Sequence, residues 1–418
     1  MKILVTNCKV FNSDKTSLYI EDDKFVNPFE IDDTVVVKDM KGNMVFPGFV
    51  DLHCHLREPG FEYKETIKTG TMSAAKGGYT SVCSMPNTFP VCDNASVVHG
   101  IMKKAKEAGF CRVYPVGACS KGEAGKELSE MGLMKEAGIV AVTDDGKCIA
   151  TAELLRKVME YSSDFGLLVM DHCEDASLSD GSMNESDTST SIGLRGIPSV
   201  AEDIIIARDI IMSEYLGIPI HICHVSTKNG VRMIREAKKR GVKVTTETCP
   251  HYFTLNDENC VNYDSNFKMY PPLRENEDVN AIIEGLADGT IDCIATDHAP
   301  HHEDEKTIEF ALANNGIVGL ETAFPLGYTY LVKTNRITLN QLIDAMVYNP
   351  SSILKLGRGS LEVGADADFT VMDLDNEFVF DKSKMLCKSK NTPYDGYKLF
   401  GKTILTVMGG RITYEELC

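Results

Sequence analysis

Side chains of the two types that bind divalent metals occur repeatedly at the ends of short apolar runs in this sequence. His53 and His55 stand two residues apart in the run 49–55, so in a strand they point to the same face. Four later apolar runs end at or close to a further histidine or aspartate, namely Asp145, His172, His224 and Asp297. Imidazole and carboxylate ligands suit Zn²⁺, and by the same chemistry Mn²⁺, Co²⁺ or Fe²⁺. Six ligands exceed one tetrahedral site, so the set predicts two ions about 3.5–4 Å apart, bridged by a carboxylate and a hydroxide.

Other histidines are expected to play different parts. An isolated histidine in a strand is more often a core or rim residue than a ligand, and the shared position at strand ends is what favours the metal site. His221 lies deeper in the run that ends near His224, and it is predicted to be structural. His99 lies in a helical segment and is expected at the surface, whereas His251 follows the seventh run and is a candidate to support a ligand from behind.

Eight strand-like runs, alternating with amphipathic helical segments, would position these residues. Strands that are nearly all apolar indicate a parallel sheet covered on its outer face, and eight βα units predict a (β/α)8 TIM barrel within an α/β fold. An open doubly wound sheet is the alternative. In a barrel the six candidate ligands would share the rim formed by the carboxyl ends of the strands. The predicted strands are 49–55, 79–85, 112–118, 139–145, 167–173, 219–225, 242–248 and 292–298, and the helices include 95–108, 152–161, 200–216, 231–239 and 279–286.

Local signals mark several helix ends. Ser199 and Glu202 have the spacing of a capping box at the start of the helix 200–216. Glycines that precede the next strand fit left-handed helix ends, and they stand at Gly109, Gly138, Gly166, Gly217 and Gly241.

Both ends of the chain carry short β-type runs instead of the βα pattern. We predict that residues 1–48 and 356–418 together build one small β-sandwich domain beside a barrel domain of residues 49–355, because each end alone has too few strands to be stable. The segment 174–198 is rich in Ser, Asp, Gly and Asn without clear periodicity. It is predicted to be a cover over the mouth of the barrel, since long loops in compact domains are usually functional or disordered.

Composition limits the classes of partner. The chain of 418 residues has 43 Lys and Arg against 61 Asp and Glu, a net charge of −18, so binding to nucleic acid or an anionic membrane is not expected. An anionic substrate would need its own cations in the site. The 14 cysteines form no CxxC pair and several lie in apolar runs, which favours reduced, buried thiols and a cytoplasmic location.

Seven segments along the chain resemble the motifs of one enzyme family, the class I (bacterial-type) dihydroorotases of the amidohydrolase superfamily. They occur in the family's order at 51–60 (DLHCHLREPG), 84–88 (SMPNT), 143–146 (TDDG), 172–175 (HCED), 224–227 (HVST), 271–274 (PPLR) and 295–301 (ATDHAPH). A further segment, 364–369 (GADADF), resembles the superfamily's return to the small sheet, so the resemblance covers essentially the whole chain.

The resemblance implies a role for each matched residue. His53, His55 and Asp297 would hold one Zn²⁺, and His172 and His224 the other, with Asp145 and a hydroxide as bridges. The hydroxide would attack the ring amide of dihydroorotate while Asp297 acts as general acid and base. Run in reverse, this reaction cyclises N-carbamoyl-L-aspartate, the third step of de novo pyrimidine biosynthesis. Substrate contacts are implied at Arg57, Asn87, His301, Asn315 and Gly316, and the Arg57 guanidinium can grip a carboxylate in a fork.

Two positions raise alternatives. Tyr270 stands where related dihydroorotases usually have an asparagine that contacts substrate, and a phenol cannot offer the paired donor and acceptor of an amide. Hydantoinases and allantoinases use a carboxylated lysine as the bridge, a part that Lys147 could play, although the Asp-Asp-Gly motif favours Asp145. A hydantoinase- or allantoinase-like enzyme is therefore one alternative. A non-catalytic subunit that supports aspartate carbamoyltransferase is another, but no metal ligand is lost here.

The partners expected from the resemblance are small molecules, dihydroorotate and N-carbamoyl-L-aspartate. A homodimer is expected, and an association with aspartate carbamoyltransferase is compatible with an active chain.

Overall fold

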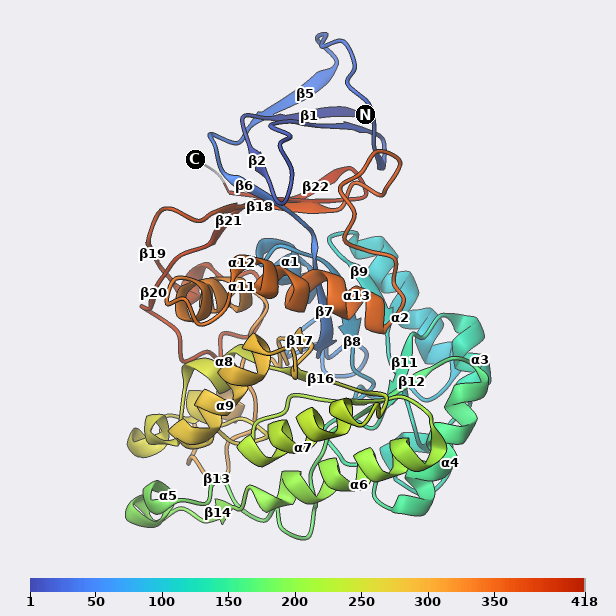
Figure 1. Ribbon diagram of the computed structural model, residues 1–418, viewed down its shortest axis with the longest axis vertical. Coiled ribbons are helices and arrows are strands. Elements are labelled where there is room, and N and C mark those ends of the chain that lie inside the picture. Colours follow the sequence, from blue (N-terminus) through green and yellow to red (C-terminus); the bar gives the residue numbers. More distant parts are fainter. Residues whose placement is uncertain (417–418) are drawn as a thin grey trace.

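A computed structural model describes residues 1–416, and strands from both ends of the chain meet at one end of the molecule (Figure 1). One sheet has the order β4-β3-β1-β5 and the other the order β2-β6-β18-β21-β22, in which β18 pairs antiparallel with β6. Residues 417–418, the end of the predicted small domain, lie outside the described residues. The bounds are β1 Lys2–Thr6, β2 Lys9–Val10, β3 Leu18–Glu21, β4 Lys24–Phe25, β5 Val35–Asp39, β6 Met44–Pro47, β18 Phe369–Asp373, β21 Lys402–Met408 and β22 Arg411–Glu415.

Apart from these two sheets, the chain contains a set of parallel strands, which follow one another in the order predicted from the sequence. They belong to two sheets, β7-β8-β9 and β10-β11-β12-β15-β16-β17, and the single predicted strand 112–118 contains both β9 and β10. An isolated parallel bridge pairs Cys54, at the end of the first strand, with His298, just after the last. The bounds are β7 Phe49–Cys54, β8 Tyr79–Ser84, β9 Arg112–Pro115, β10 Gly117–Ala118, β11 Ala141–Thr143, β12 Leu168–Asp171, β15 Ile220–Ile222, β16 Val244–Thr248 and β17 Cys293–Ile294.

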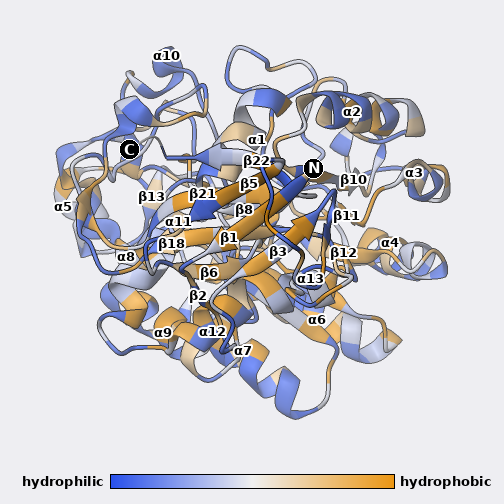
Figure 2. Cartoon of the chain, turned by 90° about the horizontal axis from the view of Figure 1, so that it is seen from above, coloured by the Kyte–Doolittle hydropathy of each residue, from blue (hydrophilic) through white to orange (hydrophobic). Residues whose placement is uncertain are grey.

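Helices follow most of these strands and surround them (Figures 1 and 2). Two predicted helices, 95–108 and 200–216, have the expected bounds, and all five glycines predicted at helix ends have positive φ. The helices are α1 Ile67–Lys76, α2 Ala95–Ala108, α3 Met131–Ala137, α4 Ala152–Asp164, α6 Val200–Leu216, α7 Lys228–Lys239, α8 Pro250–Thr254, α9 Asn276–Ala287, α10 Glu303–Lys306, α11 Ala323–Gly327, α12 Leu339–Ile343 and α13 Asn349–Ile353.

The capping box predicted at α6 is wrong. Ser199 has helical angles, φ −58° and ψ −28°, and its side chain makes no capping hydrogen bond. Glu202 is instead buried, where it accepts hydrogen bonds from the backbone N–H groups of Ser226 and Thr227 and pairs with Arg274 at 3.2 Å. The carboxylate therefore ties α6 to neighbouring loops, because a buried charge needs several partners.

The segment 174–198 has regular structure of its own. It contains α5 (Asp187–Ile192) and two short paired strands, β13 (Met183–Asn184) and β14 (Gly196–Ile197). Its contacts are with the segment after β16, since Ser186 Oγ donates to Asp257 and Tyr263 Oη donates to the carbonyl of Ile192 at 2.6 Å. None of residues 174–198 lines the cavity that holds the candidate ligands, and a cover over the mouth of the barrel stays a prediction.

The strands in the middle of the molecule are mainly hydrophobic (Figure 2). Large buried side chains such as Phe46, Phe49 and Phe324 pack together where the small sheets meet the parallel strands, with ring centroids 5.0–6.4 Å apart. Among residues 1–416, no helix is long and apolar enough to cross a membrane.

Candidate metal centre and substrate cavity

All six predicted metal ligands meet at the carboxyl ends of the parallel strands. His53 lies on β7 and His55 directly follows it, while the other four stand just beyond β11, β12, β15 and β17. Each is less than 10% exposed to solvent. Two of them, His224 with φ 31° and Asp297 with φ 43°, have left-handed backbone angles that are uncommon for residues other than glycine. Such strain is typical of functional sites.

Asp145 lies between two groups of histidines. Its Oδ1 is 3.3 Å from His53 Nε2, 3.6 Å from His224 Nε2 and 3.8 Å from His172 Nδ1. Its Oδ2 is 3.5 Å from His55 Nε2. The carboxylate therefore faces all four rings, which is the placement that a bridging ligand requires.

Asp297 completes the group on the side of His53 and His55. Its Oδ1 is 3.1 Å from His55 Nε2 and 3.7 Å from His53 Nε2. Burial alone would raise the pKa of Asp297, but its close contact with His55 and the nearby charge of His53 outweigh it and hold the pKa below its usual value. The side chain is therefore a carboxylate at neutral pH.

Several buried atoms of this group have no hydrogen-bond partner. His53 Nε2 and Asp145 Oδ1 lie 3.3 Å apart in the centre of the group, whereas His172 Nε2 and His224 Nδ1 are on the far sides of rings whose other nitrogens, His172 Nδ1 and His224 Nε2, lie 3.0 Å apart. A buried polar atom left unpaired costs roughly 1–3 kcal/mol, whereas coordination to a cation would satisfy it. Nitrogen and oxygen donors of this kind suit a divalent transition metal, and the residues present therefore fit a metal centre.

Glu247 supports His53 from behind and was missed in the sequence. It lies on β16, and its carboxylate is 2.8 Å from His53 Nδ1 and 3.2 Å from His221 Nε2. Burial pushes the pKa of Glu247 upward, but hydrogen bonds and charge from His221 and His53 prevail and lower it to about 2. His53 thus donates from Nδ1 and directs its Nε2 towards Asp145. The available signal was a carboxylate within a strand whose neighbours are otherwise apolar or hydroxylic.

His221 and His251 occupy the surroundings of the centre. His221 is structural as predicted, because it bonds Thr245 Oγ1 at 2.8 Å as well as Glu247. His251 is buried within reach of Asp297, and burial lowers its pKa to about 4, so its ring is neutral.

Lys147 does not share the position of Asp145. Its Nζ donates to the backbone carbonyl of Glu123 at 3.0 Å. The carboxylate of Asp145, and not the amine of Lys147, stands among the histidines. This placement favours an aspartate bridge over a carboxylated lysine.

A cavity of about 310 Å³ opens over the candidate ligands. All five residues predicted to contact substrate line it: Arg57, Asn87, His301, Asn315 and Gly316. Arg57 has left-handed angles, φ 60°, and donates from Nε to the carbonyl of Pro300 at 3.1 Å. The volume lies near the lower end for small-molecule sites and suits a single small ring.

Two lining residues make contacts that the sequence did not predict. Asn87 Oδ1 accepts from His55 Nδ1 at 2.9 Å, so Asn87 orients a candidate ligand as well as facing the cavity. Tyr270 stacks on His172, with centroids 5.4 Å apart and 22° between the ring planes. Its aromatic ring therefore forms a wall of the cavity beside the second pair of histidines.

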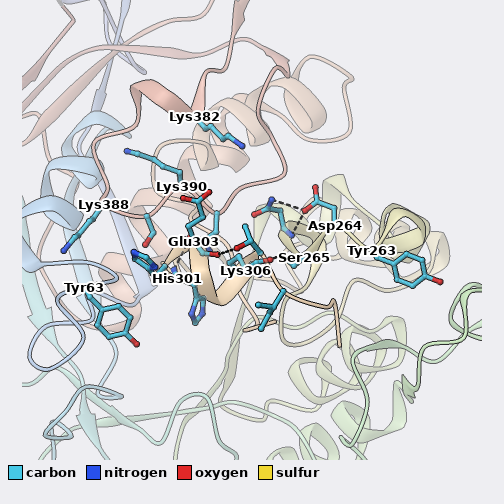
Figure 3. A pocket seen from close by; sticks show the side chains of 16 residues that line it. Tyr63, Tyr263, Asp264, Ser265, His301, Glu303, Lys306, Lys382, Lys388 and Lys390 are labelled. Carbon is cyan, nitrogen blue, oxygen red and sulfur yellow. Dashed lines mark hydrogen bonds between the residues drawn. The ribbon is translucent and has the colours of Figure 1, made fainter. Parts of the chain in front are cut away.

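A larger hollow of about 620 Å³ adjoins this cavity and shares His301 with it (Figure 3). Its wall includes Tyr63, Tyr263 and Lys306, and the six candidate ligands line only the smaller cavity or lie beneath it. The chemistry is therefore expected in the smaller cavity.

Comparisons with known proteins agree with this arrangement. Residues 42–230 match the family model described as dihydro-orotase-like. A dihydroorotase from Acetivibrio thermocellus is 58% identical over 90% of this chain and 88% of its own length, and one from Ruminiclostridium cellulolyticum is 54% identical over 90% and 88%.

Solved structures show the same fold. An L-hydantoinase (dihydropyrimidinase) from Arthrobacter aurescens matches with a TM-score of 0.86 at 24% identity, over 99% of this chain and 96% of that one. A dihydropyrimidinase from Brevibacillus agri matches with a TM-score of 0.84 at 22% identity, over 99% and 95%. Since the dihydroorotases are more than half identical over nine-tenths of the chain, the protein belongs to the dihydroorotase family.

Proposed function

We propose that this chain interconverts L-dihydroorotate and N-carbamoyl-L-aspartate, the dihydroorotase step of pyrimidine biosynthesis. The observation that carries the proposal is the convergence of four histidines and two aspartates, all buried, beside a half-buried arginine in one small cavity. The histidines and aspartates fit a metal-assisted amide hydrolysis, and the arginine fits a substrate that bears a carboxylate.

The proposed cofactor is a pair of Zn²⁺ ions. His53, His55 and Asp297 would hold one ion and His172 and His224 the other, with Asp145 and a hydroxide between them. The unpartnered His53 Nε2 and Asp145 Oδ1 support the first ion, and the approach of His172 Nδ1 and His224 Nε2 to the same oxygen of Asp145 supports the second. When bound, a pair of metal ions would lower the pKa of water so that hydroxide is available at neutral pH, and would polarise an amide carbonyl.

Asp297 is the proposed general acid and base. It lines the cavity, and it is a carboxylate at neutral pH because His55 and His53 stabilise its charge. It would accept the proton of the attacking water and return it to the departing ring nitrogen. Ring closure would use the same steps in reverse.

Arg57 is the proposed carboxylate-binding residue. Its Nε is held by the carbonyl of Pro300, which leaves the outer guanidinium N–H groups for a ligand in the cavity. Asn87, His301, Asn315 and Gly316 would surround the rest of the ring acid. The net charge of −18 repels anions in general, so these groups supply the local attraction that a monoanionic substrate needs.

Further expectations concern the whole chain. We propose that the eight parallel strands close as a (β/α)8 barrel of residues 49–355, supported by the bridge between Cys54 and His298, and that residues 1–48 and 356–418 form the small β-sandwich domain. A homodimer, an association with aspartate carbamoyltransferase and a cytoplasmic location remain predictions.

The direct test follows absorbance near 230 nm after L-dihydroorotate is added to zinc-loaded protein, with hydantoin and allantoin assayed in parallel. Metal-dependent loss of dihydroorotate alone is expected, and an Arg57→Met variant should lose most of this activity. Turnover of hydantoin or allantoin in place of dihydroorotate would support the alternative reaction and make Tyr270 the first residue to exchange.

A further inference from the structure

His301 lies between two cations in the wall of the substrate cavity. Lys64 Nζ is 3.4 Å from its Nδ1, and an Arg57 terminal nitrogen is 3.3 Å from its Nε2. His301 is only 8% exposed and Lys64 only 9%. Burial, followed by the charges of Arg57, Lys64 and Lys306, holds the pKa of His301 well below its usual value. The imidazole is therefore neutral at neutral pH.

The neighbours of His301 specify where its single proton lies. Nε2 is 2.8 Å from the backbone carbonyl of Asn315, which can only accept a hydrogen bond, so Nε2 carries the proton. Nδ1 then presents a lone pair towards Lys64, whose ammonium can only donate. Both contacts favour the same tautomer, and the Arg57 nitrogen lies beside the Nε2–H without donating to it.

Lys64 is itself held in place by Glu305. The ammonium is 2.9 Å from Glu305 Oε1, which also accepts from the hydroxyl of Tyr63 at 3.0 Å. Glu305 Oε2 accepts from the backbone N–H of His302 at 3.1 Å, at the start of α10. Tyr63 and His301 line the same hollow (Figure 3). The segment after β7 is thus fastened to the helix that directly follows His301.

We propose that Lys64, fastened by Glu305, is a positioning residue that keeps His301 neutral and protonated on Nε2, so that the Nε2–H holds the carbonyl of Asn315 in the cavity wall beside Arg57. The effect on substrate binding rests on the proposed function, because Asn315 and Gly316 are proposed to contact the ring acid. Lys64 lines the same cavity on the Nδ1 side of His301, and the proposal is that it acts through the imidazole.

Loss of Lys64 should change the charge of His301. Without the ammonium, Nδ1 faces Glu305 Oε2, which lies 3.5 Å away and favours a proton there. The charged groups that remain around the ring are Arg57, Lys306 and Glu305. In Lys64→Met the imidazole should therefore become protonated as the pH falls from 8 to 6, while in the parent protein it stays neutral.

The first test is ¹⁵N NMR of histidine-labelled, zinc-loaded protein without substrate. The chain has 10 histidines, and the His301 signals are assigned by their loss in His301→Gln. We expect a protonated Nε2 and a bare Nδ1 from pH 6 to 8 in the parent protein and in Lys64→Arg, and a second proton at pH 6 in Lys64→Met. Lys157→Met, which removes an exposed lysine paired with Glu153, is the matched control and should leave the spectrum unchanged.

The second test is the KM for L-dihydroorotate as a function of pH. At pH 6 the variant's His301 is charged and keeps its Nε2–H, so the KM of Lys64→Met should stay within about twofold of the parent value. At pH 8 the variant's ring is neutral and Glu305 favours its proton on Nδ1, so the KM should rise to about tenfold the parent value. The kcat ratio should change much less, because the proposed role of Lys64 is in substrate binding and not in proton transfer.

Two results would overturn the proposal. One is a proton on Nδ1 of His301 in the parent protein, and this result does not depend on whether any variant folds. The other is an unchanged His301 spectrum in folded Lys64→Met together with a KM ratio that does not vary with pH. If the parent protein has the predicted tautomer but does not turn over L-dihydroorotate, the proposed function fails and the positioning role stands.

Discussion

Asp297 lies within hydrogen-bonding distance of His55 and also lines the substrate cavity. Because it is proposed to move a proton, Asp297→Asn should lower kcat by roughly 10²–10⁴-fold while the protein stays folded. Steady-state kinetics and a thermal melt check this, and metal content is measured on the same samples. Asp180→Asn, at an aspartate 83% exposed, is the matched control. A rate near that of the parent in a metal-loaded Asp297→Asn sample would contradict the assignment.

Glu247 affects the centre only through the ring that it orients. In Glu247→Gln the buried carboxylate beside His53 Nδ1 becomes an amide, so His53 loses its charged partner and its basicity at Nε2 falls. Metal affinity, measured by competition with a chromophoric chelator, should drop by roughly 10–100-fold. The control is Thr245→Val, which removes the hydroxyl partner of His221 and leaves Glu247 in place. An unchanged affinity in Glu247→Gln would show that Glu247 serves the fold alone.

Among the elements, the segment between β17 and α11, which includes α10, positions three of the predicted substrate contacts. Gly316 has φ +119°, and a Cβ there would lie 2.5 Å from Ala299 Cβ and 3.5 Å from His301 Nε2. Gly316→Ala should therefore displace the cavity wall and raise KM several-fold with a smaller effect on kcat. Gly289 also has positive φ, at +76°, but its Cβ would meet open space, so Gly289→Ala has the same backbone strain without the clash. Equal kinetics in the two variants would rule out a role for the close approach.

The junction between the small sheets and the parallel strands contains a charged cluster. Asp366 bonds Lys24 at 2.5 Å and also pairs with Arg112 and Arg358, and these contacts, with Lys24 first, lower its pKa to about 2. Because the pKa of Asp366 is lower in the folded protein than in the unfolded chain, its carboxylate stabilises the fold at pH values above the ordinary pKa near 4. This stabilisation disappears as the pH falls through about 2.

Asp366→Asn should thus lower the free energy of unfolding by about 1 kcal/mol at pH 7, a modest value because the side chain is 29% exposed. The difference between variant and parent should shrink from pH 4 downwards. Chemical denaturation at pH 7, 4 and 3 tests this, and a difference that is constant over the range would contradict it.

The strands could be predicted from local stretches of sequence, whereas part of the site depends on contacts between distant segments. Apolar runs locate each strand, and the position of His172 or His224 relative to its run predicts the rim on which it lies. Contacts between distant segments could not be predicted in this way, since Glu247 meets His53 from 194 residues away. The wrong capping box at Ser199 has the same origin, because Glu202 is drawn to Arg274 and the 226–227 loop by burial.

For the whole molecule, the central claim is a metal-dependent dihydroorotase whose centre holds two ions. The most direct measurement titrates chelator-treated protein with Zn²⁺ while turnover of L-dihydroorotate and bound metal are followed together. The proposal predicts negligible activity without metal and a rise that levels off at about two bound ions per chain. Full activity in the metal-free protein, or no turnover of dihydroorotate with two ions bound, would contradict it.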